Sequence, residues 1–480
     1  MTEFSRICLS VLLFAGLLGL ATCAHAFRVV GYYPSWAIYA RNYLVTDIPV
    51  EQVTHINYAF ANISNGQVVM GDWYADNDRY YPGDCWDPGC ERGNFHQLRI
   101  LKEQYPQLKT LIAVGGWTWS ENFSDAAATP AARELFANSC AEFIIEHGFD
   151  GVDLDWEYPV FGGDWDVEHR PEDGENLTLL CQRIRVKLDS LESLNNRPYL
   201  LTLATSANAD HIADLELPAL AQVVGFINVM TYDFQGGWST HTGFNSPLFP
   251  DPADPYAEPV HSTYNLSAAM QNYIDGGFPR EQLSAGLAFY GRGFGNVANV
   301  NNGLYASFSG VSPVGTWENG VFDYTDLANN YVNQNGYTRY FHEVTRVPWL
   351  YSPAAQVMIS YDDSVSISEK AQYIVTENLG GAMFWEITGD RENVLLEALN
   401  DVFDNAQNSP APQALTMTPI GDSLSFRWQP ADGAAHYSLR SSNDADMPPI
   451  DYTLELTTPA TAAMLPRPAD PMRVYFVTAE

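Results

Sequence analysis

Basic residues are scarce in this sequence. The 480-residue chain has 24 Lys and Arg against 58 Asp and Glu, which gives a formal net charge of -34 at pH 7. Binding to nucleic acid or to an anionic membrane surface needs positive charge that this chain lacks, so neither partner is expected. The apolar fraction of 46% suits a large folded domain with a smaller one beside it.

The sequence also lacks an apolar run long enough to cross a bilayer. Its longest run, from Ile7 to Leu20, follows Arg6 and precedes the small-residue stretch 24–26. This arrangement is typical of a secretory signal peptide, predicted as residues 1–26 with cleavage before Phe27. We therefore expect a secreted protein, extracellular or periplasmic, with no membrane association after cleavage.

Cysteine is rare, with six in the chain. Cys8 and Cys23 fall in the leader, where a lipoprotein that begins at Cys23 is an alternative that Thr22 disfavours. The other four allow three pairings in an oxidising compartment, and their spacings match no zinc site, so no metal is expected. The short segment DCWDPGC favours a bond between the first two, which leaves the last two as a second pair; in order, the four are Cys85, Cys90, Cys140 and Cys181.

Short β-branched and apolar runs alternate with helix-period segments, which predicts parallel strands joined by crossover helices. Eight such units favour a closed (β/α)8 TIM barrel over residues 27–403. A doubly wound open sheet is the alternative, but no Gly-rich phosphate motif follows the first run. The eight runs are 27–33, 53–61, 108–116, 149–159, 199–207, 223–233, 282–291 and 380–387.

Three further segments complete the predicted organisation. Residues 292–357 are rich in aromatics and Asn/Gly turns and are too long for a loop, so we interpret them as an inserted α+β domain. Residues 404–413 have the Pro, Asn and Gln content of a linker. Residues 414–480 alternate in the strand period and resemble a fibronectin type III module that ends before its final strand, a small β-sandwich-like unit.

The stretch FDGVDLDWEYP places acids where a core strand is expected. In a strand, Asp153, Asp155 and Glu157 share one face, and in a barrel that face points inward to the carboxyl-terminal rim, where sites are built. Neighbouring carboxyls share protons, so the pKa of at least one of them rises. A carboxyl with a raised pKa can act as a general acid near neutral pH. A calcium loop is disfavoured because Val, Leu and Trp separate the acids. A buried hydrogen-bond network remains an alternative for Asp153 and for Asp150, which faces away.

Aromatic residues end several of the predicted strands. Tyr232 and Trp385 stand at strand ends, as does Trp117, where sugar stacking competes with an ordinary core role. We favour stacking for Trp117 and Trp385 and leave both roles open for Trp119 and Trp238.

These residues resemble those of the family 18 glycoside hydrolases. The segment DGVDLDWEYP matches the DxxDxDxE signature of that family, the chitinases, and the resemblance extends from Phe27 to about residue 404. The later motifs, together with the insertion, resemble secreted bacterial chitinases that carry a chitinase insertion domain. The supporting segments are GYYPSW, INYAF, AVGGWTWS, VMTYDF, GLAFYGRGF, GTWENGVFDY and FWEITGD.

The resemblance implies a role for each matching residue. Glu157 corresponds to the catalytic acid, Asp155 to the residue that turns toward the substrate acetamido group, and Asp153 to the inner acid that shares a proton with it. Tyr232 would hydrogen-bond the acetamido carbonyl. Many bacterial members have Ser where Ala113 stands, so the proton relay would rest more on Tyr32. The implied substrate-binding set is Trp385, Trp117, Met230, Asp233, Tyr290, Arg292, Glu318, Tyr32, Phe60 and Trp238.

The expected function is that of a secreted chitinase which hydrolyses β-1,4-N-acetylglucosaminide bonds with retention, assisted by the substrate. Its partners would be chitin and N-acetylglucosamine oligosaccharides, and we expect a monomer without a cofactor. A chitin-binding lectin of the same fold is one alternative, which the presence of Glu157 disfavours. An endo-β-N-acetylglucosaminidase is the other, against which the insertion and the rim tryptophans weigh.

Overall fold

The computed structural model describes residues 27–408 except Pro88, together with six strands between residues 416 and 479. The predicted signal peptide, with Cys23, lies outside the described residues. In the described part of the chain, no helix has the length and apolar character needed to cross a membrane.

Eight parallel strands form a closed barrel, which confirms the predicted fold class. The ladder runs β1-β14-β8-β7-β6-β5-β4-β2, and pairing of β1 with β2 closes it. An added strand, β3 (Gln67–Met70), pairs antiparallel with β2. The barrel strands are β1 (Arg28–Pro34), β2 (His55–Ser64), β4 (Lys109–Gly115), β5 (Gly151–Asp155), β6 (Leu200–Ser206), β7 (Phe226–Met230), β8 (Leu283–Ala288) and β14 (Gly381–Trp385).

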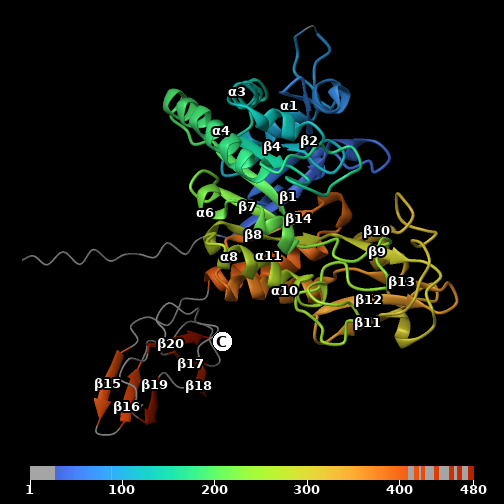
Figure 1. Cartoon of the computed structure of the whole chain (residues 1–480), viewed down its shortest axis with the longest axis vertical. Coiled ribbons are helices and arrows are strands. Elements are labelled where there is room, and N and C mark those ends of the chain that lie inside the picture. Colours follow the sequence, from blue (N-terminus) through green and yellow to red (C-terminus); the bar gives the residue numbers. More distant parts are fainter. Residues whose placement is uncertain are drawn as a thin grey trace, which may run out of the picture.

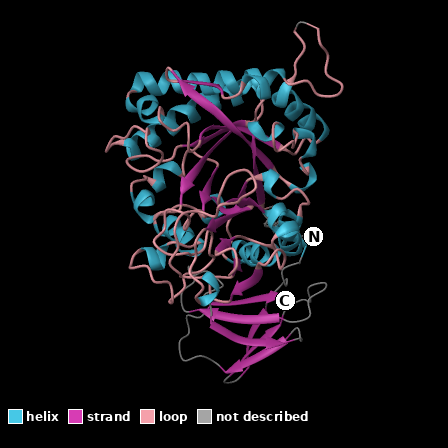
Figure 2. Ribbon diagram, turned by 90° about the vertical axis from the view of Figure 1, so that its right-hand side faces the viewer, coloured by secondary structure: helices cyan, strands magenta, loops and turns pink. Residues whose placement is uncertain are grey.

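Helices surround the strands (Figures 1 and 2). Their ends follow ordinary capping chemistry, as α3 illustrates. The Thr129 side chain accepts the Ala132 N–H at 3.1 Å, Pro130 opens the first turn, and Gly148 closes the helix at a φ of 78°. The helices are α1 (Gly93–Gln104), α2 (Phe123–Ala128), α3 (Pro130–His147), α4 (Asp173–Asn195), α5 (Ala209–Ala213), α6 (Leu217–Leu220), α7 (Val260–Thr263), α8 (Leu266–Asp275), α10 (Ser364–Thr376) and α11 (Val394–Asn408).

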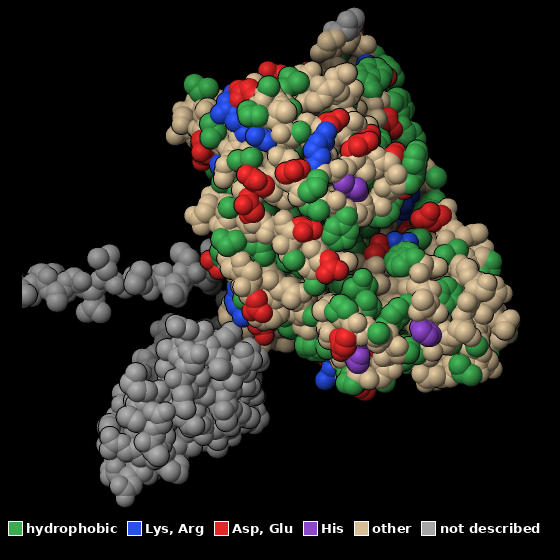
Figure 3. All heavy atoms as spheres, in the orientation of Figure 1, with side chains coloured by type: hydrophobic (Ala, Val, Ile, Leu, Met, Phe, Trp, Pro, Cys, Tyr) green, Lys and Arg blue, Asp and Glu red, His purple; other side chains and the backbone are tan. Residues whose placement is uncertain are grey.

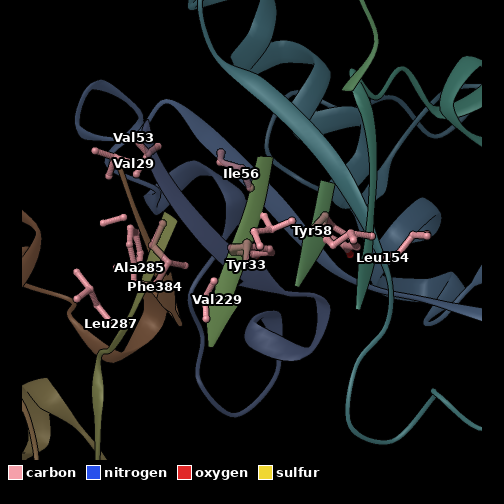
Figure 4. Packing of buried hydrophobic residues seen from close by; sticks show 14 of the residues in the cluster. Val29, Tyr33, Val53, Ile56, Tyr58, Leu154, Val229, Ala285, Leu287 and Phe384 are labelled. Carbon is pink, nitrogen blue, oxygen red and sulfur yellow. The ribbon is translucent and has the colours of Figure 1, made fainter. Parts of the chain in front are cut away.

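The barrel strands separate two apolar regions. The outward-facing side chains, Leu154 among them, pack with the helices in one large core, part of which Figure 4 shows. The inward-facing apolar side chains form a smaller group, which we call the inner cluster: Val30, Tyr32, Ala59, Phe60, Ala113, Ala204, Phe226, Met230 and Met383. Because the inner cluster is small, the barrel interior has room for the polar side chains of β5.

A second sheet follows β8 directly. Its five antiparallel strands have the order β10-β9-β13-β12-β11 and lie beside the barrel (Figure 1). The sheet begins at Tyr290 and ends at Ser360, slightly outside the 292–357 range expected for the insertion. Its elements are β9 (Tyr290–Phe294), β10 (Val321–Asp323), α9 (Tyr324–Asn330), β11 (Thr338–His342), β12 (Val347–Ser352) and β13 (Val357–Ser360).

The end of the barrel differs from the sequence prediction. Helix α11 continues to Asn408, so the first part of the expected linker, residues 404–408, is helical. Phe403, a buried residue of this helix, stacks on Phe27 with ring centroids 4.4 Å apart, which holds the helix against the start of β1.

The C-terminal region contains two three-stranded antiparallel sheets, with the orders β15-β16-β19 and β18-β17-β20. The strands are β15 (Thr416–Ile420), β16 (Ser423–Arg427), β17 (Tyr437–Ser442), β18 (Thr453–Thr458), β19 (Ala462–Pro466) and β20 (Val474–Ala479).

The cysteines correct one prediction. A disulfide joins Cys85 to Cys90, as their spacing suggested, but Cys140 and Cys181 are free thiols. These two lie on the neighbouring helices α3 and α4, fully buried in the large core, where each acts as a small apolar side chain. Burial raises the pKa of both thiols, so they remain protonated and unreactive.

Candidate active site

Asp153 and Asp155 of β5 and Glu157, two residues beyond it, point into the barrel as the alternation predicted. Val152, Leu154 and Trp156 join the large outer core. Asp153, Asp155 and Glu157 are 0, 4 and 9% exposed, so the exposed fraction rises toward the rim. The ladder sets Asp153 beside Ala113 of β4 and Thr202 of β6. Three carboxyls therefore share one buried column at the centre of the barrel.

The innermost acid, Asp153, is well supplied with donors. Its Oδ2 accepts the Tyr32 hydroxyl at 2.6 Å, and its Oδ1 accepts the Thr202 hydroxyl at 2.5 Å and the Asn228 amide at 3.4 Å. Burial raises the pKa of Asp153, and these donors act against that rise. Tyr32 was predicted from the sequence, whereas Thr202 and Asn228 were not. Each of these two residues is a polar residue at an inward position of an otherwise apolar strand, and this pattern could have identified them.

The middle acid, Asp155, is not satisfied within the described protein. Its Oδ1 is buried and has no hydrogen-bond partner there. Burial raises its pKa well above the usual range, and the charges of Glu157 and Asp153 add to the rise. Of the carboxyls in this column, Asp155 therefore binds a proton most tightly. Its unpartnered Oδ1 can accept an N–H from a ligand.

Glu157 stands at the top of the column. Burial raises its pKa to about 7, assisted by the charge of Asp233 and opposed by a hydrogen bond with Tyr158. Near neutral pH this carboxyl is divided between its acid and base forms, which is the state that general acid–base catalysis needs.

A second polar group lies across the site. Asp233 follows β7 and accepts the Tyr290 hydroxyl at 2.6 Å. Arg292 donates two hydrogen bonds to the same carboxylate, from Nε to Oδ1 at 2.8 Å and from Nη2 to Oδ2 at 2.6 Å. Because Tyr290 and Arg292 both lie on β9, the second sheet fixes this carboxylate of the barrel. Burial keeps the pKa of the neighbouring Tyr232 well above its usual value, so its hydroxyl remains a donor.

Aromatic rings line the space around the acids. Trp385 is half-buried at the end of β14 and stacks on Phe60, with centroids 5.8 Å apart and planes 15° apart. Tyr32 and Trp36 flank it at 5.7 and 6.3 Å. Trp36 was not singled out from the sequence, although it lies in the GYYPSW segment. Phe60 and Met230 belong to the inner cluster, against which Tyr232 and Trp385 pack.

The other predicted tryptophans differ in exposure. Trp117 and Trp238 are 50 and 60% exposed, and Arg292 lies over the Trp238 ring at 5.2 Å. Trp119, by contrast, is half-buried against the inner cluster. Trp117 and Trp238 therefore present open surfaces, and Trp119 serves packing.

The structure places Glu318 on an exposed turn before β10, where its backbone bridges to Val321. In the described part of the chain, Glu318 makes no hydrogen bond or ion pair with Asp153, Asp155 or Glu157. Its neighbour Trp317 reaches the barrel instead. The Trp317 indole N–H donates to Asp323 at 2.7 Å, and Arg41 lies over the ring at 5.3 Å. This contact could not be predicted from the sequence, because it joins residues far apart in the chain.

Asp150 faces away from the column. Its Oδ2 accepts the Lys102 ammonium and the Thr110 N–H, both at 2.9 Å. The buried hydrogen-bond network left open for this residue is therefore its actual role, and it lies at the opposite end of β5 from Glu157.

Comparison with known proteins agrees with this geometry. The family model for "Glycosyl hydrolases family 18" matches residues 28–390. The chain belongs to this family. The match covers every acid of β5 and all eight barrel strands, and it confirms the resemblance noted from the sequence.

Relatives of this family 18 protein carry chitinase names. It is 46% identical over 432 residues to Chitinase A1 of Niallia circulans, an alignment that covers 83% of this chain and 60% of that protein. Among solved structures it resembles chitinase ChiA74 from Bacillus thuringiensis, with a TM-score of 0.75, 34% identity and coverage of 93% of this chain and 81% of the other. A family 18 N-acetylglucosaminidase from Paenibacillus barengoltzii gives a TM-score of 0.67 at 32% identity, covering 78% and 99%.

Charged side chains are dispersed on the face of the molecule that Figure 3 shows. Figure 3 shows Asp and Glu side chains scattered over the visible face of the barrel and the second sheet rather than gathered in one patch. Within the barrel, burial raises the pKa of all three carboxyls of the column.

Proposed function

We propose that this family 18 protein is a secreted chitinase that hydrolyses β-1,4-N-acetylglucosaminide bonds in chitin and its oligosaccharides. One observation carries the proposal: Glu157, buried at the rim of the barrel with a pKa raised to about 7, stands above two further carboxyls beside a stacked aromatic floor. The chitinase names of its relatives support the substrate, and the predicted leader supports secretion.

The arrangement of the acids supports a reaction in which the substrate supplies the nucleophile. A retaining glycosidase usually has two carboxyls about 5 Å apart on opposite sides of the bond. Here Asp155 and Glu157 project from one face of one strand. The 2-acetamido oxygen of the sugar then attacks the anomeric carbon and displaces the leaving oxygen, which forms an oxazolinium ion.

The site residues divide the remaining work. Glu157 gives its proton to the leaving oxygen and later takes one from water, which attacks the oxazolinium ion with retention. The unpartnered Oδ1 of Asp155 accepts the acetamido N–H and stabilises the positive charge on the ring. The Tyr232 hydroxyl holds the acetyl oxygen. Asp153, with its three donors, stays ionised, so the proton shared by the two aspartates remains on Asp155.

Sugar binding is assigned to the aromatic surfaces. Trp385 provides the floor beneath the sugar at the cleavage site, and Trp117 and Trp238 extend the stacking surface. The Arg292–Asp233 pair fixes the wall of the cleft from the second sheet. In this proposal the enzyme works as a monomer.

The test combines substrate and variant. Wild-type protein, Glu157→Gln and the control Glu343→Gln are incubated with crystalline chitin and with soluble N-acetylglucosamine oligomers, and products are followed over time. Glu343 is a suitable control because its side chain is 83% exposed. Glu157→Gln should lose nearly all turnover and keep its affinity for oligomers, because the amide has the same shape but no proton to give. Binding without hydrolysis by the wild type would indicate a lectin instead.

A further inference from the structure

The backbone of Glu157 leaves the barrel ladder before the catalytic side chain is reached. Strand β5 ends at Asp155, so the Glu157 N–H lies beyond the pairing with β4 and β6. A buried N–H without a partner is costly. Its partner is the Ser120 hydroxyl, which accepts this N–H at 2.9 Å. A side chain of the neighbouring loop thus replaces the missing ladder bond.

Ser120 also holds the backbone on either side. Its hydroxyl lies 2.9 Å from the Gly116 carbonyl oxygen and 3.1 Å from the Asp155 carbonyl oxygen. A hydroxyl has one hydrogen and two lone pairs, so Ser120 accepts from Glu157 and shares its hydrogen between these two carbonyls. Ser120 is 0% exposed, so these bonds are buried.

Glycines make this close approach possible. Gly115 has a φ of 100°, and a Cβ there would lie 2.4 Å from the Asp155 carbonyl oxygen. Gly116 has a φ of 78°, and a Cβ there would lie 2.7 Å from the Phe60 ring. The 116–120 loop therefore runs directly against the end of β5. Its exposed residues are Trp117 and Thr118, and its buried anchor is Ser120.

We propose that Ser120 is a positioning residue for the hydrolysis proposed above: it fixes the Glu157 peptide against the 116–120 loop and so sets the direction from which the Glu157 carboxyl enters the site. The inference rests on that proposed function. Without the Ser120 hydroxyl, the Glu157 N–H can be satisfied only by a water molecule. The 116–120 loop then separates from the end of β5. A catalytic group misplaced by about 1 Å loses on the order of a hundredfold in rate.

The test compares Ser120→Ala with Ser124→Ala. Ser124 is also fully buried, one turn further on in α2, and it donates to Asp173 at 2.8 Å, away from the acids. Both variants lose a buried hydroxyl. Ser120→Ala should lower kcat on N-acetylglucosamine oligomers by roughly ten- to a hundredfold. It should also move the basic limb of the pH profile to lower pH, because water at the site relieves the burial that raises the Glu157 pKa. Ser124→Ala should leave kcat and the pH profile unchanged.

A second variant guards against misfolding. Ser120→Cys keeps nearly the same shape with a weaker donor and acceptor, so it should show an intermediate loss of kcat. If Ser120→Ala and Ser120→Cys match the wild type in kcat and in the basic limb, the positioning role is wrong, even if both are less stable.

Hydrogen exchange measures the same contact without catalysis. In mass spectrometry of the intact chain, the peptide that contains the Glu157 amide should exchange at least tenfold faster in Ser120→Ala than in the wild type or in Ser124→Ala. Equal exchange in all three would overturn the proposal. A wild type that fails to cleave chitin while the exchange result holds would instead refute the proposed function and leave the Ser120 contact in place.

Discussion

The Tyr32 hydroxyl lies 2.6 Å from Asp153 Oδ2 and so joins β1 to β5 across the barrel interior, although these strands are not neighbours in the ladder. Burial, with the charges of Asp153 and Asp155, raises the Tyr32 pKa well above its usual range, so this hydroxyl stays a donor. Asp153 is held as an acceptor in consequence. Protons taken up by the column are directed toward Asp155 and Glu157.

The fall of activity at high pH, the basic limb of the pH profile, should reflect ionisation of Glu157. Because its pKa is raised to about 7, kcat/KM on N-acetylglucosamine oligomers should fall as the pH rises above about 7, when the carboxyl no longer has a proton to give. An aryl glycoside, whose leaving group needs little protonation, should show a weaker fall. A profile for the oligomer that stays flat to pH 9 would contradict the assignment of Glu157 as the acid.

Stability should depend on the same group. The Glu157 pKa rises from an ordinary 4.5 to about 7 on folding, so the folded protein binds this proton more tightly than the unfolded chain does. The group therefore destabilises the fold as the pH rises from 4.5 to 7, and the full cost remains above 7. Glu157→Gln, which does not titrate, should gain about 3 kcal/mol over the wild type above pH 7 and little below pH 4.5. Denaturant unfolding at several pH values measures this, and a pH-independent difference would refute it.

The donors of Asp153 should control the proton on the column. Thr202→Val keeps the shape but removes the 2.5 Å bond to Oδ1, so Asp153 holds a proton more firmly and leaves Asp155 ionised beside Glu157. The basic limb should then move up by roughly half a pH unit, and kcat should fall by roughly tenfold.

Two matched variants separate this effect from packing. Thr202→Ser retains the hydroxyl and should behave like the wild type. Thr205→Val makes the same change on the opposite face of β6 and should leave the profile in place. If the pH profile of Thr202→Val matches that of Thr205→Val, the Thr202 hydroxyl does not affect which carboxyl of the column holds the proton.

Trp385 should contribute to sugar binding through its ring. Trp385→Ala removes the stacked surface over Phe60 and should weaken binding of N-acetylglucosamine oligomers by at least tenfold, measured calorimetrically with Glu157→Gln as the background. Trp385→Phe retains part of the surface and should lose less. Unchanged affinity in the alanine variant would make Trp385 an ordinary packing residue.

Much of this architecture could be predicted from the sequence because it is encoded locally. Alternating apolar runs and helix-period segments indicate a parallel barrel, and the period of two within β5 separates the Asp153 face from the Leu154 face without any knowledge of the neighbours. Strand ends mark rim residues such as Trp385 in the same way. These features need only the chain direction and the strand period.

The rest depends on how distant segments meet. Thr202 lies beside Asp153 only through the register of β5 and β6, and Trp317 meets Arg41 only through the packing of the second sheet on the barrel. The expected bond between Cys140 and Cys181 required sulfur positions that helix spacing alone does not define, and the two remain thiols. The contact of Phe403 on α11 with Phe27 at the start of β1 likewise joins residues far apart in the chain.

The stereochemistry of the first product tests the substrate-assisted mechanism most directly. Proton NMR of an N-acetylglucosamine tetramer, recorded in the first minutes before mutarotation, should show new reducing ends as the β anomer, because two displacements occur at the anomeric carbon. Oligomers with glucosamine on the non-reducing side of the bond should resist cleavage, since they lack the acetyl oxygen that attacks. Initial release of the α anomer, or a covalent sugar trapped on Asp155, would contradict the mechanism.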